Sequence, residues 1–269
     1  MNNDLEVTYT QKLDIGIIES FYKEGQVKLL WAWCVFRYRG GNSAGFSWKK
    51  ALPNMSLRQT QRIVNTLCNM GLLSQKRNSV KVLGGRHLRE QRGVLNRQCL
   101  EYWDEHLLSF DMFRAYIFAG KCENLAKVQR KIMKSLKGQH TEGVVKKNQI
   151  ALSVISGGLG ISISTAHRDK VLSKSKGYIK YFAEYRDLSP DGEKTINMGK
   201  ENALNAWRDG SYKIRKVEHT NAEGHSTTLY VERLADTIFP QVNLSRRYAS
   251  PEEKKRKQRN VMYYYNIYN

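Results

Sequence analysis

The segment SLRQTQRIVNTLCNM, residues 56–70, carries side chains that can hydrogen-bond to the edges of nucleic-acid bases. At 100° per residue, one side of a helix built from it carries Arg58, Gln59, Arg62, Asn65 and Asn69. The other side carries Leu57, Thr60, Ile63, Val64 and Leu67. Arginine can pair bidentately with guanine, and glutamine or asparagine with adenine, each pair contributing about 1–3 kcal/mol of discrimination. The solvated face of a core helix would show the same pattern, so this segment alone leaves both interpretations open.

A second segment, SISTAHRDKVLSKSKG at residues 162–177, repeats the landmarks of the first. Each begins with a serine that can cap a helix, has an arginine at its seventh residue and leads to a glycine at its sixteenth position, Gly71 or Gly177. The apolar stripe of the second copy is narrower and consists of Ile163, Ala166 and Val171. Leu172 lies nearly opposite Ile163, where it could touch a thymine methyl group or another protein. We favour a protein contact or a shift of the helix after Arg168, because an apolar residue is more often used for packing.

Similar elements surround both segments. Around the first, residues 24–38 predict a buried helix, 46–55 a short helix ending in a turn, and 72–84 a two-stranded wing after Gly71. Around the second, residues 126–138 predict a first helix and residues 150–160 a second helix and turn. Two related modules are the simplest explanation of this repeat.

This order of elements resembles the winged helix-turn-helix superfamily, over residues 13–85 and 110–187. The architecture is similar to that of plasmid and phage replication initiators and of transcriptional regulators. The resemblance implies that each third helix enters a major groove and that each wing touches the DNA backbone or minor groove. The implied contacts of the first module are Arg58, Gln59, Arg62 and Asn65 from the helix, and Lys76, Arg77 and Lys81 from the wing. Those of the second are Ser164, Thr165, His167 and Arg168, with Lys180 and Lys194 as weaker wing candidates.

The remaining segments complete the expected organisation. Residues 84–98 are rich in arginine and predict either a solvated linker or a connector lying along phosphates. Residues 101–120 predict an apolar helix packed in the core or in an interface, and residues 212–234 predict a β-hairpin. The tail is basic and rich in tyrosine; it predicts a solvated segment or an arm contacting DNA.

The fold class we expect is mainly α with small β-wings (α+β). Its expected divisions are a winged-helix domain at 13–85, a linker and connecting helix at 86–120, a second winged-helix domain at 121–199, a helix and hairpin extension at 200–245 and a tail at 246–269. Four widely spaced cysteines without a Cys-x-x-Cys pair predict reduced, structural thiols.

The charge of the chain points to a polyanionic partner. The 269 residues contain 45 Lys and Arg against 25 Asp and Glu, a net charge of +20 that disfavours compaction unless counterions or nucleic acid offset it. We expect double-stranded DNA as the partner, with a homodimer or the replication or transcription machinery left open as further partners. The apolar run at 29–36 is too short to cross a bilayer, so we expect no membrane association and a cytoplasmic location in a bacterial or phage-infected cell.

An enzyme acting on nucleic acid is the main alternative. The sequence contains neither a metal-binding His-hydrophobic-His motif nor a His-x-x-Arg motif ahead of the C-terminal tyrosines, and it has no Walker-type phosphate loop. We therefore expect no catalytic activity, no cofactor and no metal site. A winged-helix module that binds protein or RNA is a further alternative.

Overall fold

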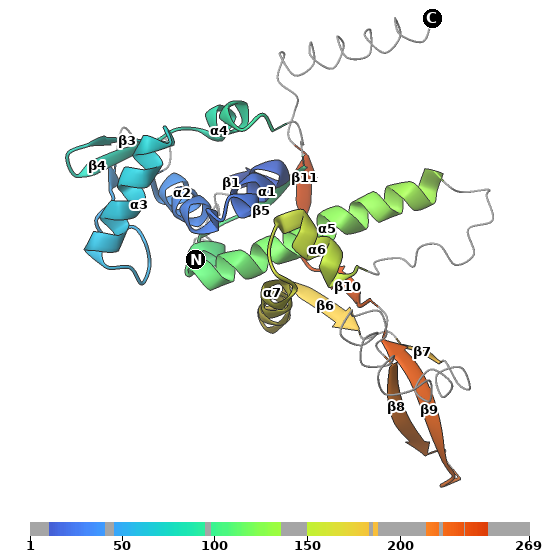
Figure 1. Cartoon of the computed structure of the whole chain (residues 1–269). Helices are drawn as coiled ribbons and strands as arrows, with labels where there is room; N and C mark the ends of the chain where they lie inside the picture. The colour runs from blue at the N-terminus through green and yellow to red at the C-terminus, as the bar shows by residue number, and fades with distance from the viewer. Residues whose placement is uncertain are drawn as a thin grey trace, which may run out of the picture.

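The computed structural model describes residues 11–40, 46–94, 98–135, 150–182, 185–187, 214–220, 223–233 and 235–246. Within these ranges the protein belongs to the mixed α+β class, with seven α-helices and small antiparallel sheets (Figure 1). Lys194, the expected helix within 200–213 and the tail from residue 247 lie outside the described residues.

The first half of the chain builds a helix–hairpin unit, which we call unit 1. It begins with β1 (Gln11–Asp14) and α1 (Ile15–Lys23), followed by α2 (Val27–Gly40) and β2 (Phe46–Ser47). It continues with α3 (Leu57–Asn69), β3 (Leu73–Lys76), β4 (Ser79–Val82) and α4 (Gly85–Gln91). β4 lies between β2 and β3 in one antiparallel sheet. The helix predicted at 24–38, the cap at Ser56 and the hairpin at 72–84 are confirmed.

The short helix predicted at residues 46–55 is wrong. The segment contains β2 and then turns. Pro53 disfavours helical geometry at the residue before it, and Asn54 has a φ of 57°, which a helix cannot contain. Trp48 and Leu52 are nevertheless buried, so the segment packs into the core as a folded loop.

The second half of the chain builds unit 2. Its elements are β5 (Gln98–Tyr102), the 3₁₀-helix η1 (Asp104–Leu107), α5 (Phe110–Ser135), α6 (Leu152–Leu159), α7 (Ile163–Ser175) and β6 (Ile179–Phe182). The single helix α5 covers most of the two segments that the sequence predicts as separate helices, and the expected border at 120/121 falls inside it. Gly120 does not break the helix; a Cβ there would lie 2.9 Å from the Leu100 side chain, so the glycine allows β5 to approach closely.

A long insertion separates β6 from its partner strand. β6 pairs with β10 (Thr237–Pro240), and between them lie β7 (Tyr185–Asp187), β8 (Ile214–Thr220) and β9 (Ser226–Arg233). β8 and β9 form the hairpin predicted at 212–234, and β7 pairs with the other edge of β9. Phe182 pairs with Thr237, and Tyr185 pairs with Arg233. The pairing of β6 with β10 is therefore followed, in nearly the same register, by the pairing of β7 with β9. The hairpin of unit 2 therefore extends into an arm that projects from the body of the molecule (Figure 1).

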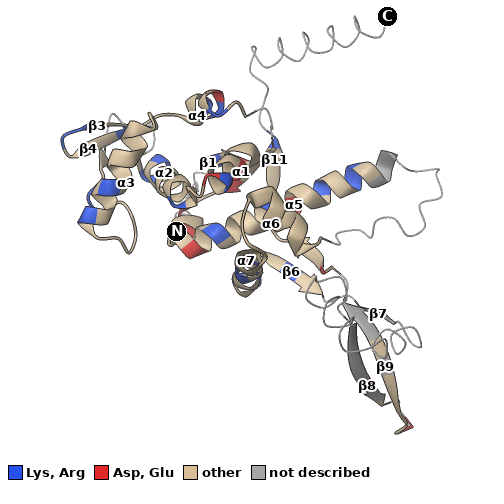
Figure 2. Ribbon diagram, in the orientation of Figure 1, with Lys and Arg blue, Asp and Glu red and all other residues tan. Residues whose placement is uncertain are grey.

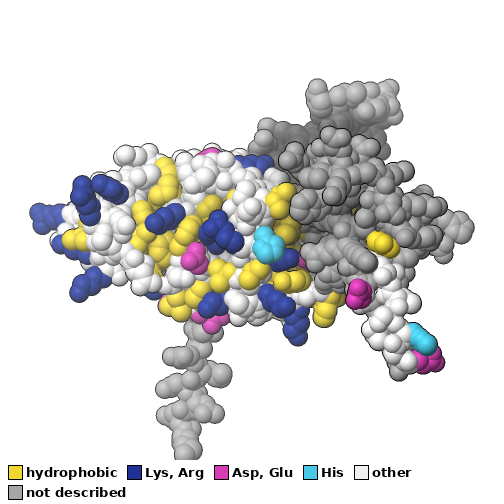
Figure 3. Space-filling view, turned by 60° about the horizontal axis from the view of Figure 1, so that its bottom comes forward, with side chains coloured by type: hydrophobic (Ala, Val, Ile, Leu, Met, Phe, Trp, Pro, Cys, Tyr) yellow, Lys and Arg dark blue, Asp and Glu magenta, His cyan; other side chains and the backbone are white. Residues whose placement is uncertain are grey.

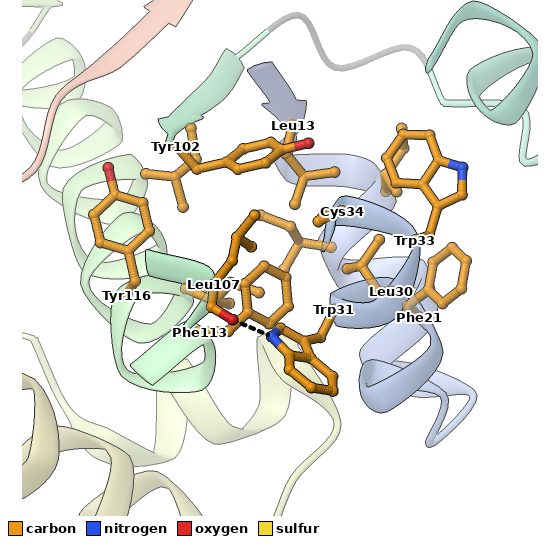
Figure 4. Packing of buried hydrophobic residues seen from close by; sticks show 14 of the residues in the cluster. Leu13, Phe21, Leu30, Trp31, Trp33, Cys34, Tyr102, Leu107, Phe113 and Tyr116 are labelled. Carbon is orange, nitrogen blue, oxygen red and sulfur yellow. Dashed lines mark hydrogen bonds between the residues drawn. The ribbon is translucent and has the colours of Figure 1, made fainter. Parts of the chain in front are cut away.

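The two units share one hydrophobic core. β5 lies between β1 and β11 (Leu244–Arg246), so strands from both halves of the chain form one sheet. Figure 4 shows the core between α2 and α5, where the indole nitrogen of Trp31 donates a hydrogen bond to the carbonyl oxygen of Leu107 at 3.1 Å. The apolar run at 30–36 is buried all around α2 rather than on one face. Among the described residues, no helix combines the length and the apolar composition needed to cross a membrane.

Candidate nucleic-acid interface

The helix α3 presents most of its predicted polar side chains to solvent. Ser56 caps it: the Oγ atom accepts a hydrogen bond from the backbone N–H of Gln59 at 3.3 Å, and the Gln59 side chain accepts one from the backbone N–H of Ser56 at 3.1 Å. Thr60, Ile63, Val64 and Leu67 are buried, as predicted, whereas Leu57 is 54% exposed. Arg58, Gln59, Arg62, Asn65 and Asn69 are exposed.

The exposed residues of α3 differ in how free their side chains are. Within the described chain, the guanidinium groups of Arg58 and Arg62 make no hydrogen bond or ion pair. The amide oxygen of Gln59 belongs to the cap, a role that the Ser-x-x-Gln spacing of a capping box already signals in the sequence. The side chain of Asn65 accepts a hydrogen bond from Gln61 at 2.7 Å. The two arginines are therefore the side chains of α3 most available to a ligand.

The hairpin of unit 1 adds a second group of cations. Lys76, Arg77 and Lys81 are exposed on β3, the turn and β4. Figure 2 shows basic positions along this hairpin. Arg77 has a φ of 53°, a left-handed conformation held by a hydrogen bond from the Gln75 side chain to its carbonyl oxygen. The turn and β2 border an open hollow lined by Phe46, Ser47, Lys76, Arg77, Asn78 and Ser79. No residue of α3 or of the hairpin 73–82 is acidic, so this end of the molecule carries positive charge only.

The helix α7 buries a different face from the predicted one. Ser162 caps it as predicted, with its Oγ atom accepting from the backbone N–H of Thr165 at 3.1 Å. The predicted stripe is wrong, because Ile163 is 58% and Val171 47% exposed, and of its three members only Ala166 is buried. The buried residues are Ala166, Asp169, Lys170 and Ser173. Leu172 is half-buried at the edge of this face, so it is not the exposed apolar residue of the helix.

Ion pairs hold the buried face of α7. Asp169 lies 2.5 Å from the guanidinium of Arg114 on α5, and Lys170 lies 2.5 Å from the carboxylate of Asp236, which precedes β10. The hydroxyl of Ser173 donates to the carbonyl oxygen of Ala115 at 2.6 Å. Burial raises the pKa of Asp169 above its ordinary value, and the neighbouring Arg114 opposes this shift. Charged side chains thus position α7 against both α5 and the base of the arm.

Aromatic side chains support the start of the unit 2 hairpin. His106 is buried and stacks on Tyr116, with ring centroids 3.6 Å apart, and Tyr178 packs edge-on against both rings. The Nδ1 atom of His106 accepts a hydrogen bond from the backbone N–H of Trp103 at 3.4 Å. Burial lowers the pKa of His106 to about 4, so the ring is neutral at physiological pH.

The predicted contacts of unit 2 are partly exposed. Ser164, His167 and Arg168 on α7 and Lys180 on β6 are exposed, whereas Thr165 is half-buried and its hydroxyl hydrogen-bonds within the cap. Lys174, which was not among the predicted contacts, is exposed on α7 with its amine 4.6 Å from the ring centroid of Tyr181. Its position two turns after His167 on the same side of the helix could have indicated it.

The arginine-rich connector forms ion pairs within the protein. Arg89 on α4 pairs with the buried Asp14 at 3.2 Å, and Arg92 pairs with Glu24 and lies over the ring of Phe21. These two side chains fasten the connector to β1 and α1. The expectation of a solvated linker is wrong for this part of the segment, and Arg89 and Arg92 are already engaged by carboxylates.

All four cysteines lie in the described part of the chain and none forms a disulfide. Within that part, no group of three or more His, Cys, Asp or Glu side chains could hold a metal ion. No protein-family model, no curated protein and no solved structure matches this chain.

Proposed function

We propose that this protein binds double-stranded DNA in a sequence-specific manner through two winged-helix units, in replication initiation or transcription regulation. The observation that carries the proposal is the repeated presentation of a capped, thirteen-residue helix followed by an antiparallel hairpin, with an exposed arginine at the same helix position. In both helices the residues facing solvent include polar and basic side chains, and neither exposed face contains a carboxylate.

The strand order supports the winged-helix assignment of unit 1. The short strand β2, which precedes α3, pairs with the second strand of the hairpin and so joins it in one sheet of order β2-β4-β3. The exposed side of each helix would then contact base edges, with its N-terminal residues closest to them, and the hairpin cations would contact phosphates. Two DNA-binding units on one chain would lengthen the recognised site. They would also increase the affinity, because binding of one unit raises the effective concentration of the other near the DNA.

The dependence of DNA affinity on salt tests the proposal. A duplex selected from a random library is labelled, and its dissociation constant is measured by fluorescence anisotropy at several salt concentrations. The hairpin of unit 1, α7 and β6 offer exposed cations for phosphate contacts: Lys76, Arg77, Lys81, Arg168, Lys174 and Lys180. If all of them bind phosphate, log K against log[salt] should have a slope of about −5, at about −0.9 per contact. A flat response would exclude this mode of DNA binding.

A matched pair of triple variants separates the interface from net charge. Changing Lys76, Arg77 and Lys81 to alanine should make the slope less steep by about 2.7. Changing Lys28, Arg86 and Lys131 to alanine removes the same charge from exposed positions on α2, α4 and α5 and should alter the slope far less. Equal effects of the two triples would mean that the basic hairpin is not a specific contact.

A further inference from the structure

The surface of α7 carries aliphatic side chains while its buried face carries charges. Ile163 and Val171 are 58% and 47% exposed, whereas Asp169 and Lys170 are almost fully buried. Globular proteins normally place these residue types the other way round. Arg114 and Asp236 form ion pairs with the two buried charges, but among the residues that the structure describes no packing accounts for the exposed aliphatic side chains.

The surroundings of Ile163 and Val171 are polar and basic. Ser164, His167, Arg168 and Lys174 share the exposed side of the helix, and its acidic residue, Asp169, points inward. Figure 3 views the molecule from the side on which α7 lies, where apolar and basic side chains are interspersed. Separate aliphatic side chains in a basic setting suit the floor of the DNA major groove, where methyl groups lie between two rows of phosphates.

The position of Ile163 repeats in unit 1. Leu57 and Ile163 are the first residues of α3 and α7, and they are 54% and 58% exposed. When a helix enters the major groove, its N-terminal residues lie closest to the base edges. Val171 follows Ile163 by eight residues, which corresponds to about 12 Å along the helix at 1.5 Å per residue. Its counterpart in α3 is Asn65, which offers hydrogen bonds instead.

We infer that α7 recognises the C5-methyl groups of thymine through Ile163 and Val171. This inference rests on the proposed DNA binding and specifies the chemistry that unit 2 reads. The half-site of unit 2 is then rich in thymine, whereas α3 reads its half-site mainly through Arg58 and Arg62. The two half-sites of one binding site are therefore unlike each other.

Replacement of thymine by uracil tests the inference, because it removes only the methyl group. In the selected duplex, deoxyuridine is substituted separately in each half-site, and dissociation constants are measured by fluorescence anisotropy at fixed salt. Each contacted methyl should contribute about fourfold to the affinity, the value of one buried methylene-sized group. The variant Ile163→Ala/Val171→Ala should bind thymine and uracil duplexes equally, and Val171→Thr, which keeps the size of the side chain, should lose part of the discrimination.

The control variant is Val128→Ala, at a valine 45% exposed on α5, and it should retain the full preference for thymine. If the parent protein binds thymine and uracil duplexes equally while its affinity still falls steeply with salt, the inference is overturned and the proposed DNA binding stands. If no duplex is bound, the proposed function fails as well. If Ile163→Ala/Val171→Ala changes the sedimentation coefficient but not the thymine preference, these residues form a protein contact and the inference is overturned.

Discussion

In α3 the buried positions hold Thr60, Ile63, Val64 and Leu67, whereas the matched positions of α7 hold Ala166, Asp169, Lys170 and Ser173. Both helices follow a serine cap, span thirteen residues and end before a glycine with positive φ. The same helix geometry therefore rests on apolar packing in unit 1 and on ion pairs in unit 2. Apolar contacts are non-directional, but an ion pair requires a particular partner in a particular place.

This difference links α7 to a distant part of the chain. Lys170 pairs with Asp236, on the far side of the insertion that carries the arm, while α3 packs mainly against α2 and β3, its neighbours in the sequence. The orientation of α7 thus depends on the base of the arm. An ion pair connects the proposed recognition helix of unit 2 to the base of the arm, whereas, within the described residues, α3 of unit 1 is not attached to an arm.

The largest effect should come from breaking the pair of Lys170 and Asp236. Replacing Lys170 by methionine leaves a buried carboxylate without its cation and should lower the free energy of unfolding by about 3–5 kcal/mol. Adding Asp236→Leu should restore most of the loss, because a well-packed apolar pair can replace a buried ion pair. Equilibrium urea unfolding measures both changes.

The same substitution elsewhere on α7 provides the control for this experiment. Lys174 is exposed, so Lys174→Met should change the free energy of unfolding by no more than about 0.5 kcal/mol. If Lys170→Met and Lys174→Met have equal effects, the ion pair does not hold α7, and the contrast between the two helices fails.

The sequence predicts the parts of this comparison that depend on local chemistry. The caps at Ser56 and Ser162, the glycines that follow both helices and the hairpin at 72–84 depend on residues close together in the chain. The buried face of α7 could not be predicted in this way. Asp169 and Lys170 find their partners 55 and 66 residues away, and a charged residue is expected at the surface until its partner is known.

The same distinction between local and long-range contacts explains which residues of the candidate site could be predicted from the sequence. Arg58 and Arg62 lie opposite a clear apolar stripe, so their exposure could be predicted from periodicity alone. The exposure of Ile163 and Val171 could not, because periodicity assigns apolar residues to the core. The continuation of β6 and β10 into the arm depends on strand pairing across more than forty residues, which local patterns do not encode.

A second contrast between the units is sensitivity to acid. Leu72 is buried after α3, whereas Tyr178 at the matched position packs against His106. The folded-state pKa of His106, about 4, lies below its unfolded value, so the unfolded chain takes up a proton first as the pH falls. The stability contributed by the neutral ring is present above pH 6.5 and lost as the pH falls toward 4. At pH 5 the loss should be about 2 kcal/mol.

Urea unfolding of the parent and of His106→Phe at pH 7.5 and pH 5 measures this contribution. The phenylalanine keeps an aromatic ring against Tyr116 but cannot be protonated, so the variant should lose about 2 kcal/mol less on acidification. His167→Gln removes an exposed histidine from α7 and is the control for the loss of one imidazole. If His106→Phe loses as much free energy of unfolding on acidification as the parent does, then His106 is not the group whose protonation destabilises the protein.

The smallest effect concerns the arginines at the matched positions of the two helices. The guanidinium of Arg62 has no partner within the described chain, whereas that of Arg168 donates to the hydroxyl of Thr165 at 3.4 Å. If Arg62 pairs with guanine, Arg62→Ala should weaken binding to the selected duplex about tenfold and relax the preference at one base pair. Arg168→Ala should weaken binding only about threefold, the size of one ordinary hydrogen bond, with little change in preference. Fluorescence anisotropy with the selected duplex and its single-base variants measures both effects. If Arg168→Ala causes the larger loss of specificity, then α7, and not α3, is the helix whose arginine recognises a base.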